Sequence, residues 1–204
     1  MFSLPFSVTL LGIVTVVVFL GLGQRVLDRM RLTGFEALII LILMIIGHFL
    51  PTITLSRGVD VNLGGLIPLG VVIYLLVTTS GLEQRRALGI SLGTAILIWL
   101  TDTFLPLQPG LLDPVFSGGI FAGLLATIWG RSRRGAFIAG ILGILLVDLA
   151  NMLQLRVQGI QQRITIGSGG LFSSIVICSF LAVAITEIIG EVRETIHLRG
   201  EHDD

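Results

Sequence analysis

The chain is organised as seven long apolar runs, each bordered by charged residues or by Pro and Gly. The runs are Pro5 to Leu22, Phe35 to Leu50, Leu63 to Thr79, Leu88 to Leu105, Val115 to Gly130, Ala136 to Leu155 and Leu171 to Gly190. Several are close to the shortest length that crosses a bilayer, about 17 residues. None shows the ten-residue alternation of a membrane barrel, so helices with internally bonded backbones are predicted. The pattern predicts an all-α polytopic membrane protein with about seven transmembrane helices, or six if the fifth run merges with a neighbour or is re-entrant.

The runs follow one another so closely that we expect one transmembrane bundle over residues 1–190 and a short polar cytoplasmic tail over residues 191–204. The N-terminus has no basic segment before the first run, and that run is followed by arginines rather than by a small-residue cleavage site. These features argue against a cleaved signal peptide.

Composition supports the membrane assignment and narrows the function. The chain of 204 residues is 53% hydrophobic and 13% charged, and its mean hydropathy is +0.99. Seven spans of about 20 residues each leave no room for a soluble catalytic domain. The formal net charge is zero, which gives no reason to expect nucleic acid as a partner. The only cysteine, Cys178, lies in an apolar run, so a disulfide within the chain is excluded.

The positions of the charges predict an orientation. Every basic residue is Arg, and ten of the thirteen lie after the first, third, fifth and seventh runs. Because arginine-rich loops stay in the cytoplasm, the N-terminus is expected outside and the C-terminus in the cytoplasm of a prokaryotic inner membrane. The cluster Arg131, Arg133 and Arg134 is a candidate for contact with anionic lipid headgroups or a protein partner.

Glycine is abundant within the runs, with 26 residues in the chain. Three pairs have the four-residue spacing that allows two helix backbones to approach closely: Gly89 and Gly93, Gly119 and Gly123, and Ala139 and Gly143. We expect these pairs to pack helices within one bundle. Contacts in a homo-oligomer are the alternative.

A long internal repeat is a second hypothesis. The connection before the third run ends in Gly64, Gly65 and Leu66, and the connection before the seventh ends in Gly169, Gly170 and Leu171. Runs one to three then correspond to runs five to seven, in a 3+1+3 parallel arrangement known from transporters whose substrate sites lie between the repeats.

A few polar residues interrupt the apolar runs, where an ionisable side chain costs on the order of 2.5 to 3.5 kcal/mol. His48, Asp102, Asp148 and Asn151 all lie near the external ends of their runs, and Asp60 and Asn62 lie in an external connection. Together they suggest a polar vestibule that opens outward and binds a small ligand or ion.

Asp148 carries most of this argument. It lies about 18 Å along the helix from Ala136 and about 12 Å below the outer edge of the membrane core. Asn151 shares its helix face. The two side chains either hold a cation, a proton or a polar headgroup, or satisfy each other and neighbouring hydroxyl groups as contacts between helices. Glu187, near the cytoplasmic end of the last run, is expected to pair with a border Arg or with water.

The connections Thr52 to Leu63 and Arg156 to Gly170 alternate apolar and polar residues and end in glycines. Short strands and re-entrant segments are alternatives, and we expect loops with some extended backbone. Phosphate-binding, zinc-protease and serine-nucleophile motifs are absent, and three His give no multi-His metal site. We therefore expect no cofactor and no enzymatic activity.

Three stretches resemble a known family: VNLGGLIPLGVVIYLL, GRSRRGAFIAGILGILLVDLANMLQL and ITIGSGGLFSSIVI. They are similar to the prokaryotic membrane proteins called domain of unknown function 1614 (DUF1614), over nearly the whole chain. The resemblance implies a polytopic membrane protein and no established activity. Relatives carry an Asp in a G-x-G-x-F-D-like glycine run, where this chain has Phe172 and Ser173.

Three functions are compatible with these features. The favoured one is binding or transport of a small ligand or ion through the outward-facing cavity. The second is a non-catalytic scaffold that uses its arginine-rich loops. The third is an intramembrane aspartyl protease, for which Asp102 and Asp148 are the only candidate pair and the G-x-G-D motif is missing.

Overall fold

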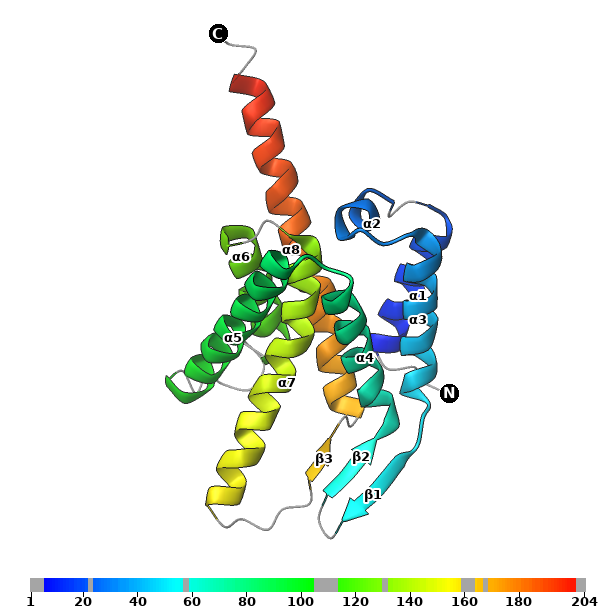
Figure 1. The fold of residues 1–204 in the computed structure, drawn as a ribbon, viewed down its shortest axis with the longest axis vertical. Helices are drawn as coiled ribbons and strands as arrows, with labels where there is room; N and C mark the ends of the chain where they lie inside the picture. The colour runs from blue at the N-terminus through cyan, green and yellow to red at the C-terminus, as the bar shows by residue number, and fades with distance from the viewer. Residues whose placement is uncertain are drawn as a thin grey trace.

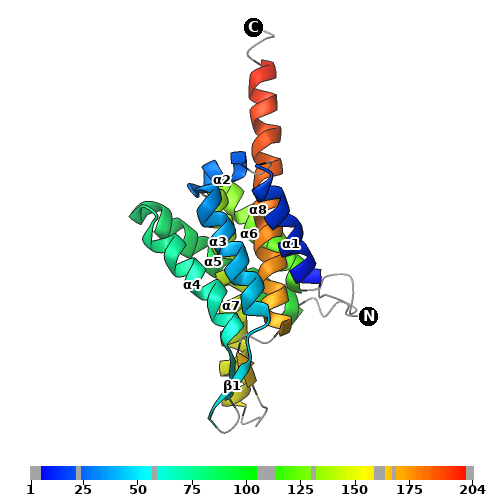
Figure 2. The same ribbon diagram turned by 90° about the vertical axis from the view of Figure 1, so that its right-hand side faces the viewer.

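The computed structural model describes residues 6–21, 24–56, 59–104, 114–129, 132–158, 164–166 and 169–200. It is a bundle of helices with a small sheet at one end (Figures 1 and 2). The helices are α1 (Phe6–Phe19), α2 (Gln24–Met30), α3 (Gly34–His48), α4 (Leu63–Val77), α5 (Gly81–Phe104), α6 (Pro114–Trp129), α7 (Arg133–Val157) and α8 (Gly169–Gly200). The helical class is confirmed, and each of the seven apolar runs forms a separate helix.

Successive long helices alternate in direction (Figure 1). Helices α3, α5 and α7 run toward the sheet, whereas α1, α4, α6 and α8 run away from it. We call the end with the strands the sheet end. The opposite end, where α5 and α7 begin, is called the arginine end because it carries Arg29, Arg86 and Arg134. α8 continues beyond the arginine end as a projecting helix that carries the C-terminus (Figures 1 and 2).

Three helices, α5, α7 and α8, are long and apolar enough to cross a membrane. Helices α1 and α2 together are also apolar enough, but they meet at a bend of 96°. If the pair is one broken span, the number of crossings is four. Helices α3, α4 and α6 are apolar but shorter, with 15 or 16 residues. At 1.5 Å per residue they extend about 22 to 24 Å, which is less than a bilayer core of about 30 Å.

Helix α7 lies at the centre of the bundle. Four of its side chains are completely buried: Ala136, Ile138, Ala139 and Ile141. These four positions point to different sides of the helix. All four are covered because α7 packs against α5, α6 and α8 and also against α4 and α2. Residues 135–147 of α7 are covered on all sides and are accordingly apolar on all sides. Asp148, Leu149 and Leu153, further along the helix, are exposed.

Glycines bring the helices together at short distances, as expected for Gly119, Gly123 and Gly143, whereas nothing in the described chain lies within 4 Å of a Cβ on Gly89. A Cβ atom on Gly123 of α6 would come within 2.9 Å of the Ala182 carbonyl oxygen of α8, and one on Gly140 of α7 within 2.6 Å of the Ser179 Cα. Gly143 meets Thr94 of α5 in the same way. Small residues at helix contacts let backbones approach where apolar side chains gain nothing by leaving lipid.

The two polar connections form a three-stranded sheet of β1 (Thr52–Ser56), β2 (Val59–Asn62) and β3 (Ile164–Ile166). The preference for loops was therefore wrong, and the strand alternative holds. Strands β1 and β2 form an antiparallel hairpin, and β2 pairs with β3 in parallel. Alternating apolar and polar side chains suit this pairing.

The register of β2 on β3 relates two distant parts of the chain. Three of the four β2 residues pair with β3, each with the residue 105 positions later, as in Val59 with Ile164. The two Gly-Gly-Leu triplets, 64–66 and 169–171, have the same separation and open α4 and α8. The repeat of three helices stays a prediction. If it exists, superposing the helices of the first three apolar runs on those of the last three should match residues that lie 105 positions apart.

The contact between Gly47 of α3 and Gly64 of α4 gives a first prediction. A Cβ on Gly64 would overlap the Gly47 carbonyl oxygen, which cannot rotate away. Gly64→Ala is therefore expected to destabilise the protein by about 1 to 3 kcal/mol, the usual cost of overpacking. Thermal unfolding of the purified protein in detergent measures the change.

Gly70→Ala on the same helix is the matched control, because nothing lies within 4 Å of the added atom. It is expected to be neutral or slightly stabilising, since Ala favours helix over Gly. Equal melting temperatures for the two variants would contradict the close contact of α3 and α4.

Candidate functional site

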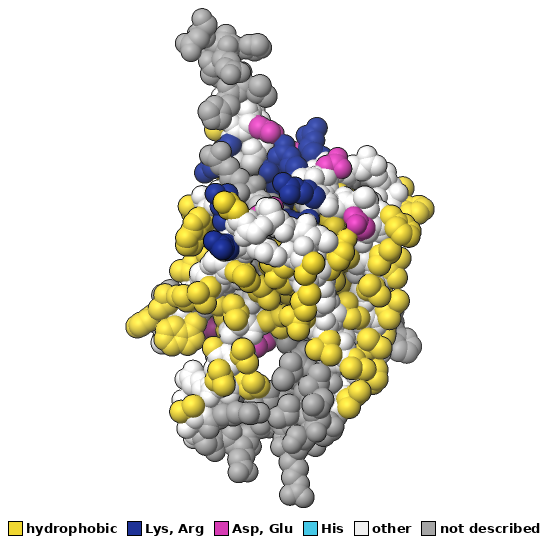
Figure 3. Space-filling view, in the orientation of Figure 1, with side chains coloured by type: hydrophobic (Ala, Val, Ile, Leu, Met, Phe, Trp, Pro, Cys, Tyr) yellow, Lys and Arg dark blue, Asp and Glu magenta, His cyan; other side chains and the backbone are white. Residues whose placement is uncertain are grey.

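Polar and charged side chains are concentrated at the two ends of the bundle. Figure 3 shows an apolar surface around the middle, with dark blue arginines gathered above it. Exposed apolar side chains of α1, α3, α5 and α6 make up this belt, among them Val16, Ile42, Leu92 and Ile128. Each end is therefore a candidate site, and the two ends differ in character.

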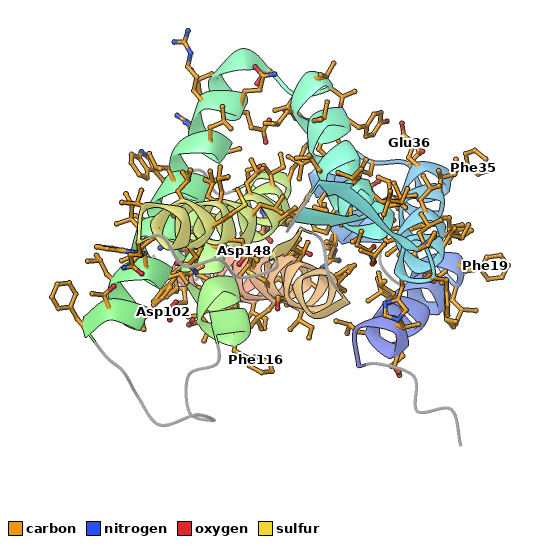
Figure 4. The ribbon with its side chains drawn as sticks, turned by 90° about the horizontal axis from the view of Figure 1, so that it is seen from below. Phe19, Phe35, Glu36, Asp102, Phe116 and Asp148 are labelled. Atoms are coloured by element: carbon orange, nitrogen blue, oxygen red, sulfur yellow. The ribbon has the colours of Figure 1, made fainter. Side chains whose placement is uncertain are left out.

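At the sheet end, Asp102 and Asp148 come from neighbouring helices that run in the same direction. Figure 4, which views this end, shows both carboxylates on the side formed by α5, α6 and α7. Asp102 lies in the last turn of α5, Asp148 lies nine residues before the end of α7, and both are exposed. Asn151, one turn further along α7, is also exposed. None of the three makes a hydrogen bond or ion pair with another described residue.

The other predicted site residues lie beside the sheet. His48 is half-buried in the last turn of α3, and its ring meets the Phe49 ring edge to face at 5.3 Å. The Asn62 side chain accepts a hydrogen bond from the Gly64 amide at 2.8 Å and donates one to the Thr52 hydroxyl at 3.0 Å. Asn62 thus caps α4 and fixes the hairpin. Asp60 lies in β2, and its side chain is outside the described residues.

The structure therefore divides the predicted vestibule into two groups. Asp102, Asp148 and Asn151 expose polar atoms that no described residue engages. His48 and Asn62 lie at the junction of α3, α4 and the hairpin, where Asn62 holds the backbone. Within the described chain, no three His, Cys, Asp or Glu side chains come together as a metal site.

At the arginine end, a buried guanidinium joins three helices. Arg134 in the first turn of α7 is 2% exposed. It donates hydrogen bonds to the carbonyl oxygens of Leu75 at 2.8 Å and Met30 at 3.3 Å and to the Thr78 hydroxyl. These acceptors lie at the C-terminal ends of α4 and α2, where carbonyls have no partner in their own helix and the helix dipole favours a cation.

Its neighbour Arg133 pairs with Glu187 of α8 at 2.7 Å, and both side chains are largely buried. The expectation that Glu187 pairs with a border Arg is confirmed. Gly190 lies one turn further along α8, and a Cβ there would come within 2.5 Å of the Arg133 Nη2. Glycine at 190 thus leaves room for the pair.

Helix α8 carries two more acidic residues on the same face. Glu191 pairs with Arg25 at 3.5 Å, and Glu194 pairs with Arg29 of α2 at 3.0 Å. Positions 187, 191 and 194 follow the spacing of one helix face. These ion pairs hold α2 beside the base of the projecting part of α8. The spacing was visible in the sequence, but the distant arginines that it meets were not.

The arginine cluster named from the sequence is thus largely occupied by protein contacts. Arg134 binds carbonyl groups, Arg133 binds Glu187, and Arg131 lies outside the described residues. Contact with anionic headgroups stays a prediction for these three. Other arginines of the same end, on α2 and α5, are more exposed.

The architecture is that of a helical bundle with apolar helices that are compatible with a membrane protein. The chain belongs to the family described as protein of unknown function DUF1614, whose model matches residues 26–185. The resemblance seen in the sequence is thereby confirmed. No curated protein and no solved structure matches the chain.

Replacing Arg134 tests its role at the junction. Arg134→Lys keeps the charge but replaces two separate terminal nitrogens with one, so the acceptors of α2 and those of α4 cannot both be reached as they are now. We expect destabilisation of about 2 to 4 kcal/mol, within the range for unsatisfied buried polar groups and broken buried charge contacts. Arg85→Lys, at an exposed position of α5, is the control and should change the melting temperature little. Similar effects of the two changes would show that Arg134 does not anchor the helix ends.

Proposed function

We propose that this protein is a seven-span prokaryotic inner-membrane protein that binds, and in the favoured case transports, a small cation or polar ligand at its outward-facing sheet end. The N-terminus lies outside, and the C-terminal part of α8 extends into the cytoplasm. The outward site consists of Asp102, Asp148 and Asn151.

Two features support the topology. The seven apolar helices alternate in direction (Figure 1), and an apolar surface lies between the polar ends on the face that Figure 3 shows. Ten of the thirteen arginines follow the first, third, fifth and seventh apolar runs in the sequence, whose helices run toward the arginine end. An excess of arginine on one side is typical of a cytoplasmic face. The short helices α3, α4 and α6 are accommodated if the bilayer thins locally or flanking residues reach the interface.

The observation that carries the binding function is the exposure of Asp148 and Asn151 on α7. If they were contacts between helices within the chain, they would be bonded to a neighbouring helix, and they contact no described polar partner. Asp102 of α5 adds a second carboxylate at the same end (Figure 4). Two carboxylates and an amide oxygen suit a hard cation, held partly through water because the set is small.

One observation favours a scaffold as the second candidate. The projecting part of α8 exposes Ile188, Val192 and Ile196 by 62%, 53% and 66%. Their spacing of four residues places them along one side of a helix. Such a row suits contact with another helix in the cytoplasm, and the scaffold function then depends on α8 rather than on the sheet end.

Cysteine labelling tests the outward vestibule and the topology together. Asp148→Cys and Asn151→Cys are expected to react with a membrane-impermeant maleimide added outside intact cells, because thiols react in water as thiolates. Leu153→Cys, an exposed apolar position on the same helix, should react much more slowly if it faces lipid. The native Cys178 is completely buried and gives a low background.

Labelling of Asp148→Cys only after the cells are opened would overturn the orientation. Equal reaction at positions 148 and 153 would overturn the distinction between a hydrated vestibule and the lipid-facing surface.

Tryptophan fluorescence tests cation binding. Trp99 lies three residues before Asp102 on the same face of α5, and Trp129→Phe leaves it as the only tryptophan. Titration with Ca²⁺ at constant ionic strength is expected to change its emission in a saturable way. Asp148→Asn should weaken the apparent affinity by about tenfold, equivalent to about 1.4 kcal/mol.

Asp28→Asn at the arginine end makes the same chemical change on an exposed residue of α2 and should leave the titration unaltered. A Ca²⁺ response that persists unchanged in Asp148→Asn, or that never saturates, would contradict a cation site between α5 and α7.

A further inference from the structure

We propose that the arginine end contains a binding site for the phosphate group of an anionic phospholipid, in a hollow between α2, α5 and α7. The hollow has a volume of about 330 Å³ and is lined by Arg29, Arg31 and Arg86, together with Ser80, Ser132 and Glu83. We call it the arginine hollow. It lies at the opposite end from the proposed cation site and does not depend on that proposal.

Charge is the first argument. Three guanidinium groups line the arginine hollow, and Glu83 is the only carboxylate among its lining residues. Glu83 accepts a hydrogen bond from the Ser132 hydroxyl at 2.5 Å and lies 3.8 Å from Arg31. Arg29 also pairs with Glu194, outside the lining. An excess of positive charge remains, which suits an anion with two or more oxygen acceptors.

Arg86 is the residue best able to bind such an anion. It is exposed and makes no hydrogen bond or ion pair with any other residue that the structure describes. The planar guanidinium matches two phosphate oxygens at once. Arg133 and Arg134, by contrast, are largely buried and already bind Glu187 and carbonyl groups. Contact with a headgroup is therefore assigned to α2 and α5 rather than to the start of α7.

The helix ends add to the positive potential. The Ser132 hydroxyl accepts a hydrogen bond from the Gly135 amide at 3.1 Å at the start of α7, and the Ser80 carbonyl accepts the Gln84 amide at 2.9 Å at the start of α5. Both serines line the arginine hollow, so two long helices begin there. The positive end of a helix dipole lies at the N-terminus of the helix and favours an anion nearby.

The path of α5 favours a lipid over a soluble phosphate. From the arginine hollow, α5 continues into the apolar belt with a row of exposed side chains, Leu88, Leu92 and Ile96, at a spacing of four residues. Leu82, at the edge of the hollow, is 63% exposed. Leu82 and Arg86 lie one turn apart on the same face of α5. A phosphate bound by Arg86 would therefore have an apolar exposed side chain beside it, as for a phospholipid at the membrane boundary.

The test uses the full-length protein in nanodiscs of phosphatidylcholine with a small fraction of phosphatidylglycerol. Native mass spectrometry after extraction counts the phosphatidylglycerol that stays bound. We expect the native chain to retain it and Arg86→Gln to lose about tenfold in affinity, the effect of removing one charged hydrogen-bonding group. Arg31→Gln should act in the same direction.

Arg85→Gln is the matched control, because Arg85 is an exposed neighbour that does not line the hollow. Equal loss of lipid in Arg85→Gln and Arg86→Gln would overturn the proposal in favour of general surface charge. A parallel arm adds inorganic phosphate to the protein in neutral detergent and follows the melting temperature. Stabilisation by phosphate that requires Arg86, without retention of phosphatidylglycerol, would overturn the lipid as the source of the phosphate.

Arg86→Gln and Arg31→Gln are each checked in neutral detergent for a single monodisperse species. Arg86 is exposed and holds no other described residue, so Arg86→Gln is expected to fold normally. Lipid retention by Arg86→Gln and Arg31→Gln at the native level would overturn the site outright.

Discussion

The arrangement of the bundle depends on the burial of Arg134. A guanidinium removed from water needs hydrogen-bond acceptors, and here groups at the C-terminal ends of α2 and α4 accept from both of its terminal nitrogens. The cation thus links the N-terminal helices to α7, the central helix. Because the same end contains the pairs of Arg133 with Glu187 and Arg29 with Glu194, positive charge is partly neutralised inside the protein and partly left exposed at the arginine hollow.

Between the polar ends, shape holds the helices together. In lipid, an apolar side chain gains little by leaving one hydrocarbon environment for another, so contact area and close backbone approach become decisive. Gly64, Gly123 and Gly140 each occupy a place where a methyl group would meet backbone. The apolar residues that point outward, such as Leu92 and Ile128, are then free to form the belt.

Much of this organisation was predictable from local patterns. Each of the seven apolar runs forms a helix, as the sequence predicts. Gly119 and Gly123, four residues apart, lie at a close helix contact, and Glu187 pairs with Arg133. The seven-residue helix α2 is too short to show a hydrophobic period.

What the patterns missed depends on partners far along the chain. The burial of Arg134 is decided by carbonyl groups 59 and 104 residues away, and the β2 and β3 strands pair across a similar separation. For the candidate site, the sequence placed Asp102 and Asp148 at the same end of the bundle, in agreement with the structure (Figure 4). The role of Asn62 as a helix cap depends on contacts that only the folded chain provides.

The parallel pairing of β2 with β3 also sets an order for biogenesis. The hairpin β1–β2 is complete once residue 62 has been synthesised, but its second edge stays open until β3 appears about one hundred residues later. Four more helices have to be made in that interval. An unpaired strand edge is a site for wrong pairing, and closing so long a loop is slow. Completion of the sheet is therefore a late step, because β3 is synthesised only after α7.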